Sequence, residues 1–465
     1  MSRPFVRPEA DAVNPRGGLA LPTTLAILST ALAAAVAYGN HPWWAQYRYG
    51  LEVILLSRRL QWPLIVGSLF AAVALVGLVG AGKQRAWWLI SLAPILALFL
   101  HAFATDPTSG MSAVENPTFV PAAVAGNFVG DDDFVVGLTF QGKDYAYPYA
   151  ALYWTPAVIH AQHDKRVLLM WSAPANRAVA MTVKREVKAR NLDVVSTPAN
   201  ALLLYDASKG DFVNGLTGLT VRGAKPAGFV TPVPTWKMPW GQWRNAHPDT
   251  LVMTPVAPRG LWLRSRQLAQ PPRQPLWPSC PMPGQNAQPA ALMPDLRVVL
   301  VGTHKPFAVA SGSLGVSPVN VSADGAPVMA FREPLTKVAR AFSRRVVDDL
   351  APTFALHRGH KRKPDAMFID ADTNSSWNTS GVAIDGSKDY RGRKLSPVPA
   401  EDDLYWGVMK HWYPDLQLVE AEPQSEGAVQ AADAVQTNTA SVAQAARAAS
   451  RRASGGRRTS PRPAS

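Results

Sequence analysis

The chain has 465 residues, a formal net charge of +14 and a single cysteine, Cys280. One cysteine excludes an intrachain disulfide and a zinc site built from cysteines. The length allows two or three domains, and the arginines gathered after residue 421 indicate a basic arm more than a basic body.

Residues 1–19 form a polar N-terminal segment, and three apolar stretches follow it. Spanning the hydrocarbon of a bilayer takes about 20 apolar residues in a helix, because a helix satisfies every backbone polar group internally. We therefore predict a three-helix transmembrane region at residues 20–105, in contact with membrane lipid, with spans near 20–38, 62–81 and 87–104. Uncharged runs of 31, 23 and 20 residues lie between Arg16 and Arg48, between Arg59 and Lys83, and between Arg85 and Asp106.

The distribution of Lys and Arg around the spans favours a cytoplasmic N-terminus. Five basic residues then lie inside and three lie in the opposite loop, in line with the positive-inside rule. This predicts a multi-pass protein of the cytoplasmic (inner) membrane whose region after residue 105 is extracytoplasmic. Ala35-Val36-Ala37 resembles a signal-peptidase site, but its apolar region is long for a cleaved signal, so we favour an uncleaved helix.

The region after residue 115 has the pattern of a mainly β (α+β) protein. Stretches rich in β-branched and apolar residues, such as Phe134–Phe140 and Val167–Trp171, have strand length and end at turn residues. Two stretches have a helical pattern instead, around Tyr149 to Ile159 and from Trp240 to Ala246.

A sequence signature occurs twice in this region. Trp240-Gly stands eight residues before Pro248-Asp249, and Trp406-Gly stands eight residues before Pro414-Asp415. We expect two related tandem units, at 115–255 and 296–420. Between them, residues 256–295 read as a Pro-rich linker, since proline suits neither a helix interior nor a central strand.

Residues 421–465 are rich in Ala, Gln, Ser and Arg and carry too little apolar surface to form a core. We predict a disordered, Arg-rich tail that makes unspecific contacts with an anionic envelope polymer or lipid. Nucleic-acid binding is the alternative and requires a cytoplasmic C-terminus, so we expect no specific nucleic acid as partner.

Four residues are candidates for acid and base catalysis. Asp206 and Asp370 occupy equivalent places in the two copies of the signature, and His160 and His247 carry imidazoles, which often serve as acid and base groups. The alternative for the two aspartates is a carboxylate that accepts hydrogen bonds from backbone N–H groups of a turn, which is the interpretation we favour.

Four tryptophans are candidates for ligand binding by stacking: Trp236, Trp240, Trp243 and Trp406. Because Trp240 and Trp406 stand at matched places in the repeat, packing of the core is the competing interpretation.

The sequence offers no convincing metal site. His160 and His163 converge on one metal only in a helix, and Asp131–Asp133 lack the spaced ligands of a calcium loop. We interpret both as turns and expect no metal and no cofactor.

The region resembles the domain-of-unknown-function 3179 family, a group of bacterial and archaeal extracytoplasmic or membrane-anchored proteins. The resemblance covers 115–255 well and 296–420 more loosely. It is carried by Asn116–Pro121, Asp132–Gly137, Ala146–Tyr149, Trp240–Trp243 and His247–Thr250.

The chain departs from the family at a cysteine pair. A Tyr-Cys-Pro-Leu-Cys-Gly-like stretch of the family corresponds to Trp171–Asn176, where Ser172 and Ala175 replace the cysteines. A Trp-His-Glu stretch corresponds to Trp154-Thr155-Pro156. Thiol, metal or redox chemistry through that pair is therefore absent from this chain.

These observations predict a membrane-anchored extracytoplasmic scaffold or binding protein without catalytic activity. The alternative is a cell-envelope enzyme with Asp or His acid and base groups in a cleft between the repeat units.

Overall fold

The structure is a computed structural model that describes residues 19–81, 86–105, 110–256, 273–275, 296–302, 306–323, 326–334, 337–346, 351–357, 365–386 and 390–419. The expected linker and polar N-terminal segment lie largely outside these residues, and the expected tail lies wholly outside them. Contacts divide the chain into two compact units. The first unit comprises Met1–Pro306 and Pro399–Gln417, and the second comprises Phe307–Val398 and Leu418–Ser465.

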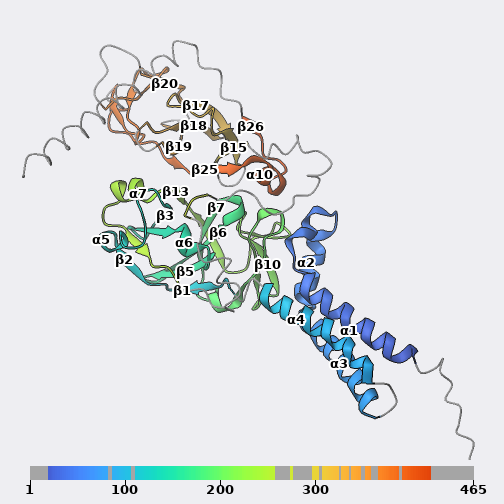
Figure 1. Cartoon of the computed structure of the whole chain (residues 1–465). Helices are drawn as coiled ribbons and strands as arrows, with labels where there is room; N and C mark the ends of the chain where they lie inside the picture. Colours follow the sequence, from blue (N-terminus) through green and yellow to red (C-terminus); the bar gives the residue numbers. More distant parts are fainter. Residues whose placement is uncertain are drawn as a thin grey trace, which may run out of the picture. The chain divides into compact units, whose positions relative to one another are not determined.

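Three helices of the first unit are long and apolar enough to cross a membrane: α1 (Ala20–Tyr38), α3 (Gln61–Gly80) and Ala86–Thr105. The third begins as a 3-10 turn, η2 (Ala86–Ser91), and continues as α4 (Leu92–Thr105). These candidate spans coincide with the three predicted from the sequence to within one residue at each end. Figure 1 shows α1, α3 and α4 side by side.

A reciprocal pair of hydrogen bonds joins α1 to α3. The Ser29 hydroxyl donates to the Ser68 carbonyl oxygen at 2.7 Å, and the Ser68 hydroxyl donates to the Ser29 carbonyl oxygen at 2.9 Å. Both serines are fully buried. Such bonds stabilise helix pairs in lipid, where an unpaired hydroxyl finds no water.

The connection between the first two spans attaches to the strand-rich part of the first unit. It contains η1 (Pro42–Gln46) and α2 (Gly50–Arg59), which the sequence analysis did not predict. Ile54 of α2 is buried in one cluster with Val195 and Phe212. Arg58 forms an ion pair with Asp193, with 2.5 Å between Nη2 and Oδ2. The connection after α1 and the strands of the first unit therefore lie at the same end of the three-helix bundle.

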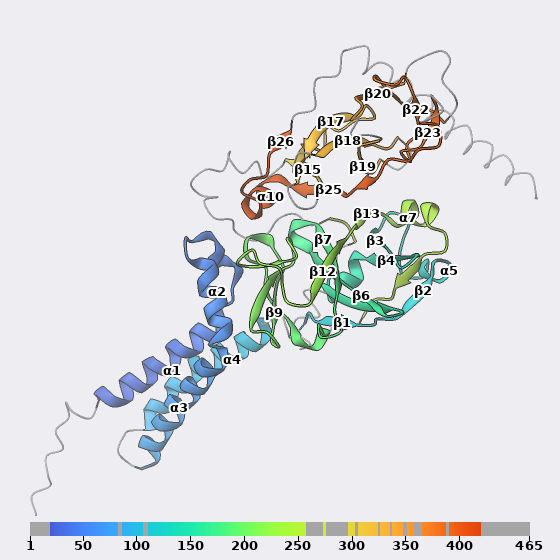
Figure 2. The same cartoon turned by 180° about the vertical axis from the view of Figure 1, so that it is seen from behind.

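A central sheet organises the strands of the first unit, in the order β1-β5-β6-β7-β12. Its inner strands are apolar without alternation, because clusters of side chains cover both faces. Figure 2 shows β12 beside β7, with which it pairs antiparallel. The strands are β1 (Ala113–Glu115), β5 (Ala157–Gln162), β6 (Lys165–Ser172), β7 (Arg177–Val183) and β12 (Phe229–Val233).

A second sheet covers one face of the central sheet, in the order β13-β3-β4-β14-β2. Its strands are β13 (Trp236–Pro239), β3 (Phe134–Phe140), β4 (Lys143–Pro148), β14 (Leu251–Met253) and β2 (Phe119–Pro121).

A third sheet covers the other face, in the order β11-β10-β9-β8. Its strands are β8 (Leu192–Ser196), β9 (Leu203–Asp206), β10 (Asp211–Asn214) and β11 (Leu219–Thr220).

Short helices connect these strands. The first unit contains α5 (Ala122–Ala125), α6 (Tyr149–Leu152), α7 (Trp240–Ala246), η4 (Ala173–Ala175), η5 (Ala189–Asn191) and η6 (Pro198–Asn200). The helix predicted from Trp240 to Ala246 is confirmed as α7. The helix predicted around Tyr149 to Ile159 is wrong beyond Leu152, because Ala157 onward pairs with β6 as a strand.

Two strands and a helix distant in the sequence complete the first unit. β15 (Arg297–Val301) pairs antiparallel with β25 (Ala400–Tyr405), with a register shift between Val298 and Leu300. α10 (Trp406–Trp412) follows β25 directly. Contacts thus place 399–417 in the first unit, whereas the repeat in the sequence places it in the second.

The second unit has a core of its own around Phe331, Phe368 and Trp377. One sheet has the order β17-β18-β19-β24 and another the order β20-β21-β22-β23, and β16 pairs parallel with β26. The strands are β16 (Phe307–Ala310), β17 (Val319–Ala323), β18 (Ala326–Arg332), β19 (Ala339–Ser343), β20 (Phe354–Leu356), β21 (Phe368–Asp370), β22 (Ser376–Trp377), β23 (Ala383–Asp385), β24 (Pro397–Val398) and β26 (Leu418–Val419).

Candidate functional site

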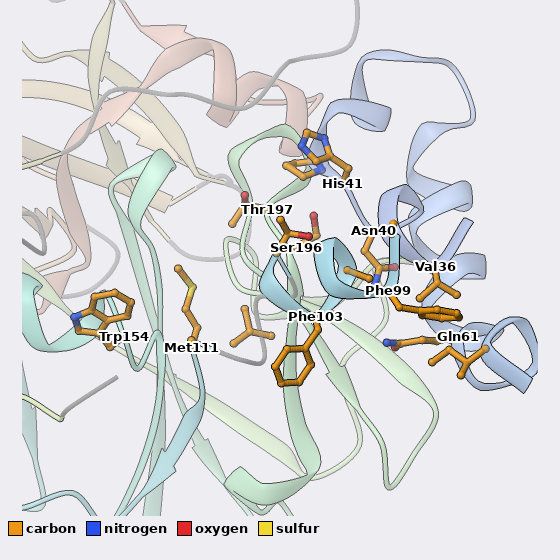
Figure 3. A pocket seen from close by; sticks show the side chains of 17 residues that line it. Val36, Asn40, His41, Gln61, Phe99, Phe103, Met111, Trp154, Ser196 and Thr197 are labelled. Atoms are coloured by element: carbon orange, nitrogen blue, oxygen red, sulfur yellow. The ribbon is translucent and has the colours of Figure 1, made fainter. Parts of the chain in front are cut away.

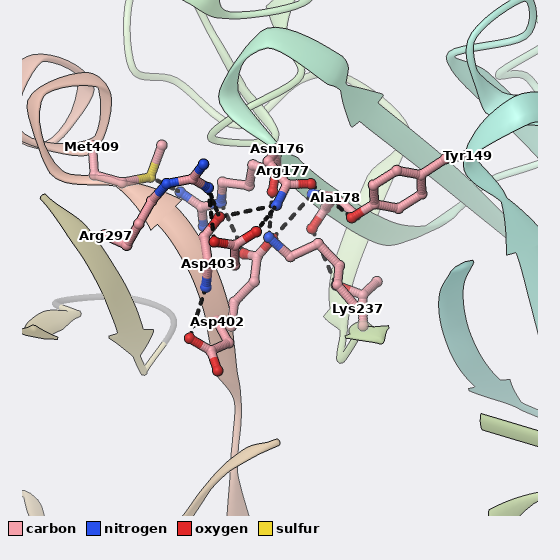
Figure 4. A network of polar contacts seen from close by, with 11 residues as sticks. Tyr149, Asn176, Arg177, Ala178, Lys237, Arg297, Asp402, Asp403 and Met409 are labelled. Carbon is pink, nitrogen blue, oxygen red and sulfur yellow. Dashed lines mark hydrogen bonds and ion pairs between the residues drawn. The ribbon is translucent and has the colours of Figure 1, made fainter. Parts of the chain in front are cut away.

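Buried and half-buried charged side chains from β7, β13, β15 and β25 meet inside the first unit (Figure 4). Burial of a charge is costly unless it is paired, so a group of buried charges marks a site that the fold specifically supports. We call this group the Lys237 cluster; its members are Asn176, Arg177, Lys237, Arg297, Glu401 and Asp403.

Lys237 lies at the centre of the cluster. Its Nζ is 3.5 Å from Glu401 Oε1, with the two side chains 1 % and 12 % exposed. The same ammonium group donates a hydrogen bond to the carbonyl oxygen of Asn176. Burial lowers the pKa of Lys237, while the charge of Glu401 acts in the opposite direction. Lys237 stands between two large apolar residues of β13, Trp236 and Met238.

Glu401 connects three groups of the first unit. Its Oε2 is 3.1 Å from Nε of Arg177, and its Oε1 accepts from the backbone N–H of Ala178 at 3.0 Å. Arg177 also lies over the ring of Tyr413, with 5.0 Å from Cζ to the ring centroid. One carboxylate therefore holds two buried cations and the first residues of β7 in place.

Asp403 holds the other side of the cluster. Its backbone has a φ of +58°, which a non-glycine residue adopts only when its surroundings enforce it. Its Oδ2 accepts from Asn176 Nδ2 at 2.9 Å, and its Oδ1 is 2.7 Å from Arg297 Nη1. Burial raises the pKa of Asp403, and the charges of Lys237 and Arg297 oppose that shift. Tyr149 extends the network by donating to Asn176 Oδ1 at 2.6 Å.

A cavity of about 650 Å³ adjoins the cluster, also within the first unit. Its lining includes the charged or polar side chains of Arg177, Lys225, Glu401 and Tyr413 beside apolar residues such as Val179 and Leu300. Pockets of 300 to 1,000 Å³ with apolar walls and a few placed polar groups are typical of sites for small molecules. The arrangement can therefore hold an organic molecule that carries one polar group.

The aspartates singled out from the sequence each close a turn. Asp206 accepts from the backbone N–H of Ser208 at 2.9 Å and from its hydroxyl at 2.6 Å. Asp370 is fully buried and accepts from the Thr373 backbone N–H at 2.6 Å and from Trp377 Nε1 at 2.9 Å. These bonds occupy the carboxylates as turn-forming acceptors.

The two candidate histidines lie apart from the cluster. His160 is 3 % exposed, shares a 2.7 Å hydrogen bond with the Tyr147 hydroxyl, and burial lowers its pKa to about 4. His247 stacks on Trp243 at 3.9 Å between ring centroids and lies 2.9 Å from Asp144 Oδ2. Among the described residues, no hydrogen bond, ion pair or ring contact joins His160, His247 and Asp206.

The candidate tryptophans are core residues rather than an open stacking surface. Trp240, Trp243 and Trp406 are buried, and Trp236 is half-buried. Trp243 donates from Nε1 to the Thr250 hydroxyl at 2.9 Å, so its indole N–H is satisfied.

The residues considered for metal binding serve local structure. Asp131 pairs with Arg244 at 3.1 Å, and Asp133 accepts from the Gly130 backbone N–H at 2.8 Å. Across the described ranges, no three His, Cys, Asp or Glu side chains gather as metal ligands would.

The positions at which the family resemblance predicts a cysteine pair, Ser172 and Ala175, flank the loop that leads into the Lys237 cluster. The Ser172 hydroxyl donates to the Asn200 carbonyl oxygen at 2.7 Å and accepts from the Leu202 N–H at 2.9 Å. Ala175 is buried directly before Asn176, whose φ of 49° turns the chain into β7. The loop at which the resemblance predicts a departure from the family therefore borders the cluster.

The sequence analysis missed Lys237 and Glu401. One signal was available, because Lys237 and Asp403 each stand three residues before a Trp-Gly pair. A charged residue at this place in both copies of the repeat indicates a charge that needs a partner, which the sequence does not name.

Three helices long and apolar enough to cross a membrane, followed by a strand-rich region with a charge cluster, indicate a multi-pass membrane protein with a folded, strand-rich part. The family model described as "Protein of unknown function (DUF3179)" matches residues 108–416, so the chain belongs to this family. Comparison with the curated proteins and with the solved structures finds no match.

Proposed function

We propose that the protein is a membrane-anchored binding protein of the cell envelope, without catalytic activity, whose ligand occupies the cavity beside Arg177, Glu401 and Tyr413. The observation that supports this best is the cavity of about 650 Å³ whose mainly apolar lining includes the Arg177–Glu401 ion pair. The ion pair fixes Arg177 without consuming all five of its N–H donors, so the guanidinium can orient a carbonyl, carboxylate or hydroxyl of the ligand.

Mass spectrometry of co-purified small molecules tests this proposal. The full chain in detergent is exposed to an envelope extract, washed and eluted, beside an Ala400→Trp variant that fills the cavity and an Ala355→Trp control at an exposed position of the other unit. We expect a compound enriched at least tenfold by the native chain and the control but not by Ala400→Trp. Equal profiles for all three proteins would contradict the proposal.

We also infer that the strand-rich region arose from two related units. The order β5-β6-β7-β12 matches β17-β18-β19-β24, and β8-β9-β10-β11 matches β20-β21-β22-β23. Each Trp-Gly pair begins a seven-residue helix directly after a strand, in α7 and in α10. On this proposal Lys237 and Asp403 are descendants of one ancestral position.

The folded region is extracytoplasmic in this proposal, and the Arg-rich tail makes screened contacts with an anionic polymer or lipid of the envelope. The motivation is the excess of basic residues around the N-terminus and between the second and third spans. A topology reporter fused after Ser465 tests the orientation. A cytoplasmic signal would reverse it and would favour nucleic acid as the partner of the tail.

A cell-envelope enzyme is the second candidate, favoured by one observation. Burial lowers the pKa of Lys237 and raises that of Asp403, and divergent pKa values are common where acid and base catalysis occurs. Asp206, Asp370, His160 and His247 are the acid and base groups of this candidate expected from the sequence. Asp206→Ala separates the two functions: unchanged stability with loss of a cellular phenotype would favour the enzyme.

A further inference from the structure

A second cavity, of about 490 Å³, lies where the membrane-crossing helices meet the strands of the first unit (Figure 3). Three helices contribute to it at the same end of the bundle. Val36 lies in the last turn of α1, Gln61 is the first residue of α3, and Phe103 lies in the last turn of α4. The strand side contributes Met111 and Ser196. The cavity therefore lies at the level where the bilayer meets the folded region.

The walls of this cavity are mainly apolar. Figure 3 shows Phe99, Phe103 and Met111 around it, with Trp154 on the strand side and Val36 on the helix side. Aromatic and aliphatic walls of this kind favour hydrocarbon over water, and the volume is within the range of sites for small ligands.

Two buried polar atoms lie on the cavity lining. Ser196 is 3 % exposed, and within the described part of the chain neither its hydroxyl nor the Oδ1 atom of Asn40 has a hydrogen-bond partner. A buried polar group without a partner costs roughly 1–3 kcal/mol, so such groups normally meet a ligand or an ordered water. Figure 3 shows Asn40 and Ser196 on the lining of the same cavity.

The lining limits the charge of the occupant. Among the described residues that line this cavity, none is Asp, Glu, Lys or Arg, and His41 already accepts from the Trp43 N–H at 3.2 Å. A phosphate or ammonium headgroup would be buried here without a countercharge, which is strongly unfavourable. A hydroxyl fits, since it donates one hydrogen bond and accepts others, as Asn40 Oδ1 and the Ser196 hydroxyl require.

We propose that this cavity binds an uncharged bilayer lipid with one free hydroxyl, such as a diacylglycerol, with its hydrocarbon between Phe99, Phe103 and Met111. The hydroxyl donates to Asn40 Oδ1 and accepts from Ser196. This site is separate from the cavity beside Arg177, and the lipid proposal does not depend on the function proposed for that cavity.

Photolabelling of the full chain tests the lipid site. The protein is placed in phosphatidylcholine nanodiscs that contain a photoactivatable diacylglycerol, and the labelled peptides are identified after irradiation. We expect label on the peptides that carry Phe103 and Met111, and a reduction of at least fivefold in Ala102→Trp, which fills the cavity. Ala97→Trp, on an exposed face of the same helix, is the matched control and should keep the label.

Ser196→Ala guards against a folding artefact, because it removes an unpartnered hydroxyl and should not lower the thermal midpoint. We expect it to weaken labelling by diacylglycerol at least threefold while labelling by a photoactivatable triacylglycerol stays low in both proteins. Three results would each overturn the proposal. They are labelling by a photoactivatable phosphatidylcholine or triacylglycerol as strong as that by diacylglycerol, retention of label in Ala102→Trp, and no label at all, as for a site filled by water.

Discussion

Lys237 and Glu401 form an ion pair inside the first unit, with 3.5 Å between Nζ and Oε1. Arg177 shares the same carboxylate at 3.1 Å, so Glu401 pairs with two cations that are almost completely removed from water. The relationship is asymmetric, because loss of Glu401 leaves two buried cations, whereas loss of Lys237 leaves a carboxylate that still has Arg177.

We therefore expect Glu401→Gln to destabilise the protein more than Lys237→Met does. Removal of one partner of a buried ion pair costs roughly 3–5 kcal/mol, and Lys237→Met should cost less than that because Glu401 keeps a partner. Thermal unfolding of the full chain in detergent, followed by tryptophan fluorescence, measures both. In the double variant the loss of stability should be smaller than the sum of the losses in the two single variants. Strict additivity would mean that the two side chains do not interact.

Gly137 lies directly under the ring of Trp243. A Cβ atom at this position would stand 2.2 Å from Cζ3 of Trp243, which is fully buried and cannot move aside cheaply. Gly137→Ala should therefore lower stability by about 1–3 kcal/mol through overpacking. Gly126→Ala is the matched control, since nothing lies within 4 Å of a Cβ there. Equal midpoints for the two variants would show that the Trp243 ring does not pack on Gly137.

Asp370 is expected to be structural in the second unit. Asp370→Ala leaves the buried Trp377 indole N–H and the Thr373 backbone N–H without their acceptor, which should cost about 2–4 kcal/mol. The exposed Asp365→Ala should be neutral within about 0.5 kcal/mol. Limited proteolysis of the full chain, with cleavage sites mapped within 307–398, reports on this unit. Unchanged protection in Asp370→Ala would leave the carboxylate free for another role.

His160 predicts a pH dependence of stability. Burial lowers its pKa to about 4, below the ordinary value of 6.5, so the unfolded chain binds the proton more readily. Stability should fall as the pH decreases from 6.5 to 4, by at most about 3 kcal/mol, and should not respond to this group above pH 6.5. Unfolding midpoints of the native chain and of His160→Phe between pH 8 and 4 isolate the contribution of this residue.

The variant lacks the titrating ring, so the stability of the native chain relative to that of His160→Phe should fall as the pH decreases from 6.5 to 4. A constant difference from pH 8 to pH 4 would mean that His160 takes up its proton in the folded state as readily as in the unfolded chain.

Local patterns in the sequence determined the type and position of elements that have strong hydrophobic periodicity or clear turn residues at their ends. The three spans follow from uncharged runs of sufficient length, and the helix at Trp240 follows from a short helical pattern that ends before His247-Pro248. The helix expected around Tyr149 to Ile159 stops at Leu152, because β-branched residues that follow satisfy their backbone groups by pairing with β6.

Tertiary structure alone decided which charges are buried and which residues meet. Nothing in the composition around Lys237 names Glu401 as its partner, since the two come together only when β25 packs near β7 and β13 in the first unit. The same holds for the cavity between Phe103 and Ser196, whose walls come from membrane helices and from a strand far along the chain. Sequence periodicity records which face of an element is apolar, but burial and pairing depend on long-range packing that no local pattern encodes.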